Sequence, residues 1–221
     1  MTKIIMIRHG QSVANFERRF AGHSDFELTE LGRAQAACAA AYMRREGIVP
    51  DAIYSSDLKR AHNTALPIAN EFGLPINDTE SLREIFAGVW EAMSVDDIFE
   101  QYHDAFVIWR TDIANARCTE GESVSELYDR IVSFVCKLAE DNDGKTLLLA
   151  THATPVRAID CFSRGWGSER MSDLQFVRNS SISIFEYENG IITPVRVDIV
   201  DHLDPSMVTA VPKALSDVKK K

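Results

Sequence analysis

The sequence predicts an α/β fold: a three-layer α/β/α sandwich whose central sheet is mainly parallel, with an antiparallel edge. Three observations support this fold class. Short apolar runs at residues 3–7 and 146–150 are each followed by a helical pattern, which is typical of parallel strands buried on both faces. Residues 181–187 and 192–199 alternate in polarity around an Asn-Gly turn at residues 188–190, which predicts a hairpin at the sheet edge.

Local signals predict most of the other elements. Residues 29–46 are rich in alanine and are followed by a glycine, as expected for a helix. Residues 52–54 are a short strand candidate leading into a helix that ends near residue 72, and Pro67 is expected to bend that helix. These segments give the alternation of strand and helix that the fold class requires.

Helix starts are marked by capping residues. Ser123 and Glu126 fit a capping box, which predicts a long helix from Ser123. Thr154 and Pro155 are expected to cap and open another helix. An aromatic-rich helix is expected from Ser94, and its rings are either core or a contact surface for a leaving group, with core favoured.

Composition limits the possible partners. The net charge of −9 argues against a nucleic-acid surface, which is built from clustered Lys and Arg. No apolar run reaches the length of a membrane span, so we expect no membrane partner and a cytoplasmic location. The four cysteines are scattered without a CxxC pair, so their spacing supports neither a zinc site nor redox chemistry.

Three residues offer the groups that cleavage of a phosphate monoester needs. Arg8 follows the first strand and its guanidinium can bond two phosphoryl oxygens, while Gly10 allows close backbone approach. His9 can attack phosphorus only through an unprotonated ring nitrogen, so its other nitrogen should donate to a backbone carbonyl. Arg60 offers a second guanidinium.

Residues 8–15, Arg-His-Gly-Gln-Ser-Val-Ala-Asn, open a series of motifs that resembles the histidine phosphatase superfamily, also called the phosphoglycerate mutase-like family. The resemblance covers roughly residues 3–200 in order. It continues through Phe20-Ala21-Gly22, Asp25, Leu28-Thr29-Glu30-Leu31-Gly32, Gln35-Ala36, Ser55-Ser56-Asp57-Leu58-Lys59-Arg60-Ala61, Thr64-Ala65, Leu82-Arg83-Glu84-Ile85, Gly88-Val89-Trp90-Glu91, Gly121-Glu122-Ser123 and His152.

The resemblance implies a metal-independent phosphatase that needs no cofactor and acts on a small phosphomonoester. His9 would be the phosphorylated nucleophile, Glu84 the proton donor, and Arg8, Arg60 and His152 the rest of the phosphate pocket. His152 is expected to act as a cation that donates to a phosphoryl oxygen. The further substrate contacts implied are Gln11, Ser12, Asn15, Gly22 and Ala153.

The domain organisation follows from length and the resemblance. A chain of 221 residues suits one domain. We expect a single phosphoglycerate mutase-like catalytic domain over residues 1–205, a small cap-like insertion at about residues 88–122, and a solvated tail at residues 206–221. Homo-oligomer formation is left open by the sequence.

Two departures from the family pattern fall near the site. His152-Ala153-Thr154 stands where His-Gly-Gly is common, and Ala92 stands where a glycine usually follows Trp-Glu. The first departure makes the backbone approach more crowded and bears on substrate size.

Two other functions remain as alternatives. The first is cofactor-dependent phosphoglycerate mutase-type transfer; residues 88–122 are short and hold only Arg110 and Arg117 against eight acidic residues, a poor setting for a second phosphate. The second is a catalytically silent phosphate-binding regulatory protein, which would not require a nucleophile and an acid together. A metal site ranks lower, because two arginines would repel a divalent cation.

Overall fold

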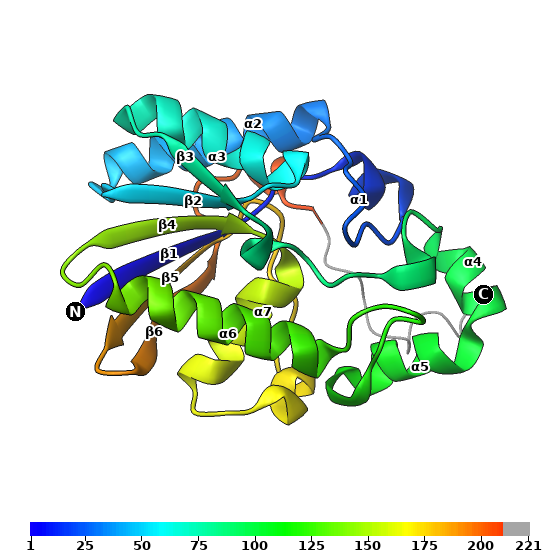
Figure 1. Cartoon of the computed structure of the whole chain (residues 1–221). Helices are drawn as coiled ribbons and strands as arrows, with labels where there is room; N and C mark the ends of the chain where they lie inside the picture. Colours follow the sequence, from blue (N-terminus) through cyan, green and yellow to red (C-terminus); the bar gives the residue numbers. More distant parts are fainter. Residues whose placement is uncertain (210–221) are drawn as a thin grey trace.

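A six-stranded sheet forms the centre of the molecule in the computed structural model, which describes residues 1–209 (Figure 1). The strand order is β3-β2-β4-β1-β5-β6. The strands are β1 Thr2–Arg8, β2 Ala52–Ser56, β3 Ile76–Thr79, β4 Thr146–Thr151, β5 Ile182–Glu188 and β6 Ile191–Ile199. Of the tail predicted at residues 206–221, residues 210–221 lie outside the described part of the chain.

The first four strands are parallel, and the hairpin β5–β6 joins antiparallel to β1. β1 is a fully covered central strand: it lies between β4 and β5, and its residues Ile4, Ile5, Met6 and Ile7 are fully buried. A continuous apolar run is what a strand covered on both faces needs. The predicted mainly parallel sheet with an antiparallel edge is therefore confirmed.

Helices cover both faces of the sheet. α2 (Glu30–Arg45) and α3 (Lys59–Phe72) pack on one face, and α6 (Val124–Glu140) and α7 (Ala153–Ser163) pack on the other (Figure 1). The buried apolar residues accordingly form two clusters. This arrangement confirms the three-layer α/β/α sandwich.

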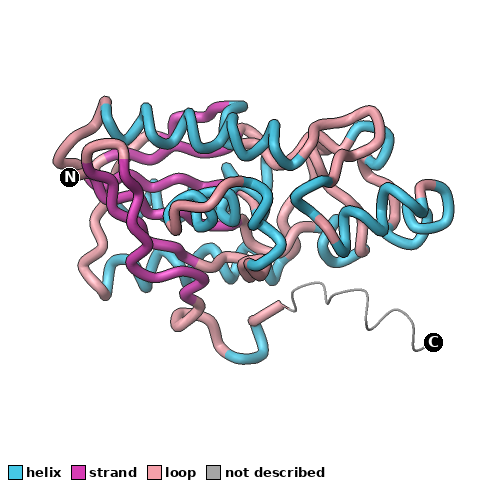
Figure 2. The backbone as a smooth tube through the Cα atoms, turned by 90° about the horizontal axis from the view of Figure 1, so that it is seen from below, coloured by secondary structure: helices cyan, strands magenta, loops and turns pink. Residues whose placement is uncertain are grey.

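Shorter helices lie beyond the ends of the parallel strands. They are α1 Val13–Glu17, α4 Val95–Gln101, α5 His103–Thr111 and the 3₁₀ helices η1 Glu80–Leu82, η2 Gly88–Trp90, η3 Ile113–Asn115, η4 Ser168–Asp173 and η5 Pro205–Met207. The strands and the α4–α5 extension occupy opposite ends of the molecule (Figure 2). The aromatic rings of this extension that are buried, Trp90, Phe106 and Trp109, belong to a core cluster, as favoured from the sequence.

Two local predictions need correction, and two short elements were missed. The helix expected from Ser94 begins there but ends before Tyr102, whose φ of −130° and ψ of 42° are not helical and separate α4 from α5. The break lets the two helices pack together, with the rings of Phe99 and Phe106 6.3 Å apart. α7 begins at Ala153, not after Thr154, because the extended residue His152, which directly follows β4, is already the N-cap position of the helix. β3 and α1 were not predicted.

The parallel strands deliver their C-terminal residues to one edge of the sheet, as expected for ligand sites in such folds. His9 follows β1, Ser56 ends β2 and His152 follows β4. Within residues 1–209, none of the helices combines the length and apolar character needed to cross a bilayer.

Candidate active site

The two histidines singled out from the sequence meet at the C-terminal edge of the sheet. The ring centroids of His9 and His152 are 5.2 Å apart, with the rings near an edge-to-face arrangement. Both side chains are almost completely buried. β1 and β4 are adjacent parallel strands, so residues 143 positions apart in sequence are brought together by the register of the sheet.

The tautomer of His9 is fixed by a backbone carbonyl. Its Nδ1 lies 2.7 Å from the carbonyl oxygen of Gly10, which can only accept a hydrogen bond. Nδ1 therefore carries the proton, and Nε2 keeps its lone pair. The expected hydrogen bond from the ring to a backbone carbonyl is present in the structure.

The backbone of His9 is held from two sides. Its N–H donates to the carbonyl of Thr151 at 2.9 Å, and its carbonyl accepts from the N–H of Ser180 at 3.2 Å. The side-chain amide of Asn179 also donates to this carbonyl at 3.0 Å, and to Oδ1 of Asn15 at 3.0 Å. Asn179 and Ser180 escaped the sequence analysis, because no local motif marks a residue that acts across the sheet.

Two buried arginines flank His9. Arg8 Nη1 donates to the carbonyl of Val177 at 2.5 Å, and Arg60 donates to the carbonyls of Ser24 and Gly22 at 2.8 and 2.7 Å. Burial lowers the pKa of each guanidinium to about 10, so both remain charged at neutral pH. In each, Nε is buried without a hydrogen-bond partner.

His152 differs from expectation. Burial, followed by the charges of Arg60, His9 and Arg8, holds its pKa well below 6.5, so the cation predicted from the sequence is wrong for the unliganded pocket. His152 Nε2 lies 2.9 Å from the hydroxyl of Ser56. If that hydroxyl donates, Nδ1 carries the proton, and this Nδ1 is buried without a partner.

The pocket thus presents three buried nitrogens without hydrogen-bond partners: Nε of Arg8, Nε of Arg60 and Nδ1 of His152. The charges of both arginines also lower the pKa of His9, after burial as the first cause, so they act on its ring electrostatically. Buried donors without partners are costly. An anion with several oxygens would satisfy them, and a phosphoryl group is such an anion.

Glu84 lies on the side of the pocket formed by the start of α7. Its Oε2 accepts from the N–H of Thr154 at 3.3 Å, and its Oε1 accepts from the N–H of Ile85 at 2.9 Å. Its negative charge raises the pKa of both Arg8 and Arg60 against the effect of burial. The carboxyl therefore belongs to the same electrostatic site as the arginines.

The residues after His9 serve mainly to shape the loop. Ser12 is buried and caps α1 by accepting from the N–H of Asn15 at 3.3 Å, and Asn15 Oδ1 accepts in return from the N–H of Ser12. Gln11 Oε1 accepts from the hydroxyl of Thr29 at 2.9 Å. The side-chain NH₂ groups of Gln11 and Asn15 can still donate to a substrate. Contact of these residues with substrate stays a prediction.

A carboxylate that the sequence analysis did not assign organises the loop around Gly22. Glu91 accepts the N–H groups of His23, Ser24 and Ala87 at 2.7, 2.7 and 2.9 Å, and also the hydroxyl of Ser24. This loop supplies the carbonyls that hold Arg60. The sequence marks Glu91 as part of the motif Gly88-Val89-Trp90-Glu91, but gives it no role.

The departures from the family pattern are visible in the backbone. Ala92 has a φ of +60°, the left-handed conformation that favours glycine. The loop therefore keeps this turn despite the alanine. Ala153 is buried as the first residue of α7, with its methyl group where a glycine would leave space.

Acid should destabilise the folded protein through these histidines. The folded pKa values of His9 and His152 lie below the ordinary value, so below about pH 6.5 the unfolded chain binds protons that the folded chain does not. The free energy of unfolding should fall by about 1.4 kcal/mol per pH unit for each histidine. Urea unfolding between neutral and mildly acidic pH measures this.

His152→Asn should reduce the pH slope of that unfolding free energy, while the same change at His62, which is partly exposed and paired with Asp78, should leave it in place. An equal slope in the parent and in His152→Asn would contradict the assignment of a buried neutral His152.

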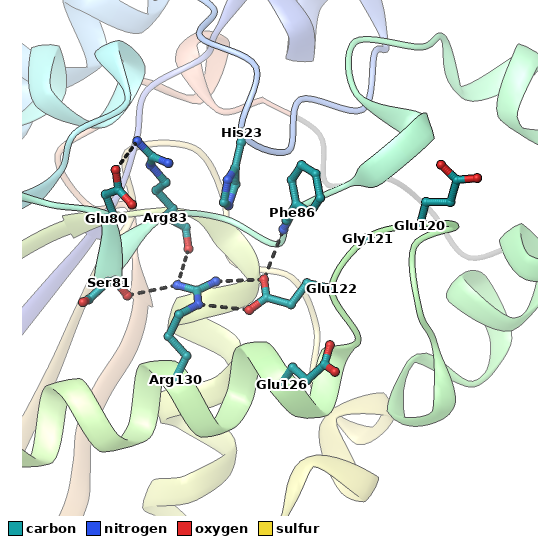
Figure 3. A pocket seen from close by; sticks show the side chains of 10 residues that line it. All are labelled: His23, Glu80, Ser81, Arg83, Phe86, Glu120, Gly121, Glu122, Glu126 and Arg130. Carbon is teal, nitrogen blue, oxygen red and sulfur yellow. Dashed lines mark hydrogen bonds and ion pairs between the residues drawn. The ribbon is translucent and has the colours of Figure 1, made fainter.

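Residues 1–209 also contain a groove outside the histidine pair. A groove of about 670 Å³ lies beside Glu84, with His23, Arg83, Phe86 and Arg130 in its wall (Figure 3); it does not include His9. In the same described residues, no cluster of three or more His, Cys, Asp or Glu side chains is arranged to hold a metal ion.

The sequence profile of the histidine phosphatase superfamily, branch 1, matches residues 4–199. Phosphoserine phosphatase 1 of Hydrogenobacter thermophilus is 30% identical over 210 residues, which cover 95% of this chain and 98% of that protein. The probable phosphoglycerate mutase GpmB of Escherichia coli is 32% identical over 198 residues, covering 86% of this chain and 87% of that protein.

A solved structure supports the fold. The mycobacterial glucosyl-3-phosphoglycerate phosphatase in complex with VO₃ superposes with a TM-score of 0.77 at 29% identity, covering 83% of this chain and 92% of that one.

Proposed function

We propose that this chain, which belongs to the histidine phosphatase superfamily and is a phosphoric monoester hydrolase, cleaves a small phosphomonoester through a phosphohistidine intermediate on His9. In this proposal Glu84 is the proton donor, Arg8, Arg60 and His152 bind the phosphoryl group, and neither metal nor cofactor takes part. The observation that carries it is the His9 ring, whose Nε2 is left unprotonated by the hydrogen bond from Nδ1 to Gly10 and whose centroid lies 5.2 Å from that of His152, a side chain with an unpartnered buried nitrogen.

In the first step Nε2 of His9 attacks phosphorus, and the bond from phosphorus to the leaving oxygen breaks. Glu84 gives its proton to that oxygen, so the product leaves as a neutral alcohol. The carbonyl of Gly10 stabilises the ring as its Nδ1–H becomes more acidic. Arg8 and Arg60 hold the phosphoryl oxygens as negative charge is redistributed over them.

In the second step water attacks the phosphohistidine from the side the leaving group has vacated. Glu84, now a carboxylate, accepts a proton from that water. The bond from phosphorus to His9 Nε2 breaks, which returns the lone pair to the ring and releases inorganic phosphate. One carboxyl thus serves as acid and then as base.

Glu84→Gln is expected to separate substrates by their leaving groups. An alkyl phosphate needs protonation of its leaving oxygen, whereas 4-nitrophenyl phosphate does not, so kcat should fall by about 10²-fold or more for the alkyl ester and far less for the aryl ester. Steady-state kinetics on both esters measures this ratio. Equal losses on both substrates would remove Glu84 from the role of acid.

Water is the favoured acceptor because residues 88–122 offer a poor setting for a second phosphate. Arg117 is held by the carboxylate of Glu126 at 2.6 Å and by the carbonyl of Gly121 at 2.7 Å. Arg110 is half-buried, and that burial lowers its pKa. The acidic side chains of the segment outnumber these two cations, which disfavours a dianion.

Phosphoglycerate mutase activity is the second candidate, and the similarity to the Escherichia coli protein favours it. Supplying 3-phosphoglycerate with a catalytic amount of 2,3-bisphosphoglycerate tests it. Formation of 2-phosphoglycerate faster than release of inorganic phosphate would replace hydrolysis by transfer as the main activity.

Several further properties belong to the same proposal. Residues 1–205 are taken as one catalytic domain and residues 88–122 as a cap over its entrance, while the leaving group is left open among small phosphomonoesters. Gln11, Ser12, Asn15, Gly22 and Ala153 are proposed to border the substrate. A cytoplasmic location and the absence of nucleic-acid and membrane partners remain expectations from composition.

A further inference from the structure

Glu84 sits on a segment that the sheet does not hold. After η1 ends at Leu82, residues 83–87 have neither helical nor strand structure. A proton donor must keep its carboxyl within hydrogen-bond reach of the leaving oxygen. Something other than a strand ladder must therefore fix the main chain on both sides of Glu84.

One side chain from α6 binds the main chain at and just before Glu84. Arg130 Nη1 donates to the carbonyls of Ser81 and Arg83 at 3.0 and 3.2 Å, and its Nη2 donates to the carbonyl of Glu84 at 3.3 Å. Figure 3 shows the guanidinium below the segment, with the first two of these bonds drawn. The arginine reaches three carbonyls within four residues, including that of the proposed acid.

A carboxylate completes the arrangement. Glu122 accepts from Nε and Nη2 of Arg130 at 3.0 and 2.9 Å, and its Oε2 also accepts from the N–H of Phe86 at 3.1 Å (Figure 3). The N–H of Glu122 donates to the carbonyl of Phe86 at 2.9 Å. The pair therefore binds carbonyls before Glu84 and an amide after it.

The chemistry of the pair suits this geometry. A guanidinium has five donors in a rigid plane, so it can serve several carbonyls and a carboxylate at once, which an ammonium cannot do in a fixed orientation. The side chain of Glu122 is only 15% exposed and that of Arg130 27% exposed, so solvent competes little for these bonds.

We propose that Arg130 and Glu122 form a positioning pair that holds the carboxyl of Glu84 in line with the leaving oxygen. This inference rests on the proposed function, in which Glu84 is the proton donor. Neither residue touches the phosphoryl group; they act through the main chain of residues 81–86.

The test uses the ratio of kcat for an alkyl phosphate to kcat for 4-nitrophenyl phosphate. In Arg130→Met and Glu122→Gln this ratio should fall by about 10-fold or more, while kcat for the aryl ester should stay within about 3-fold, because only the alkyl ester depends on the acid. Arg130→Lys should lower the ratio almost as much as Arg130→Met, since lysine keeps the positive charge but not the planar set of N–H donors. Glu122→Gln is nearly isosteric and keeps the test available if Arg130→Met does not fold.

Arg117→Met is the matched control. Arg117 also pairs with a glutamate at the start of α6, but it has no bond to residues 81–86. Its removal should leave the ratio unchanged. Combining Arg130→Met with Glu84→Gln should give no further loss in the ratio beyond Glu84→Gln alone, because both changes remove the same proton transfer.

The outcomes distinguish failure of the positioning pair from failure of the proton donor. If Glu84→Gln lowers the ratio but Arg130→Met and Glu122→Gln slow both esters equally, the positioning pair is wrong and the proton donor stands. If Glu84→Gln itself slows both esters equally, the proton donor is wrong and the positioning pair is overturned with it.

Discussion

Replacing His9 by alanine is expected to lower kcat by about 10⁴-fold or more, because the variant loses the proposed nucleophile and not merely a phosphate contact. The His9→Ala variant should still fold, since the main chain at residue 9 is held by Thr151, Asn179 and Ser180 and not by the histidine ring. The measurement is release of inorganic phosphate from a panel of phosphomonoesters, together with thermal unfolding.

A labelled-phosphate trap gives the direct test of the intermediate. The parent protein quenched during turnover should carry label that acid or hydroxylamine removes, and His9→Ala should carry none. Turnover in the parent should survive a chelator. Label retained by the variant, or activity lost with the chelator, would contradict the proposed mechanism. His62→Asn, a change at a partly exposed histidine outside the site, is the control.

Arg60→Lys is expected to lower kcat/KM by about 10²–10³-fold, the usual cost of removing one preorganised donor from a buried anion site. Arg60 is fully buried, and its two Nη atoms are already used on the carbonyls of Ser24 and Gly22. A lysine cannot hold both carbonyls and also direct an N–H into the pocket. Competitive inhibition by inorganic phosphate should weaken in parallel with kcat/KM.

The neighbouring Lys59 provides a control for Arg60→Lys. Lys59 is half exposed and lies near Asp25 and Glu27, so Lys59→Met should leave both kcat/KM and phosphate inhibition close to the parent values. Unchanged phosphate inhibition in Arg60→Lys would show that Arg60 serves only to hold the loop at Gly22 and Ser24.

The elements that were predicted correctly are those with strong local signals. The buried run that became β1 and the capping box at Ser123 depend on neighbours in the sequence. β3 was missed because it is an edge strand whose residues Asn77 and Asp78 are exposed, so it lacks an apolar pattern. α1 was missed because five residues are too few for a helical period to appear.

For the site, the sequence predicted the residues but not the charge state of each. The motifs predicted which side chains would gather. In the structure the rings of His9 and His152 meet, and the charges of Arg8 and Arg60 act on His9 and are themselves affected by Glu84. The charge state of His152 was wrong, because its low pKa depends on burial and on neighbours that only the fold supplies.

The residues that hold the main chain of His9 and Glu84 could not be predicted from the sequence. Asn179 binds the carbonyl of His9 across the sheet, and Arg130 binds the carbonyl of Glu84 from another helix. These contacts join segments 46 or more positions apart, and neither has a local pattern. A single sequence marks reactive groups more clearly than the side chains that orient them.

The position of β1 has a consequence for how the chain folds. Its two partners, β4 and β5, lie in the last third of the sequence, so during synthesis this apolar strand has no native neighbour until most of the chain has emerged. Such non-local pairing slows folding and leaves a hydrophobic strand open to intermolecular contact. The strand that leads into His9 therefore needs protection from intermolecular contact, by a chaperone or by low concentration, until the sheet closes around it.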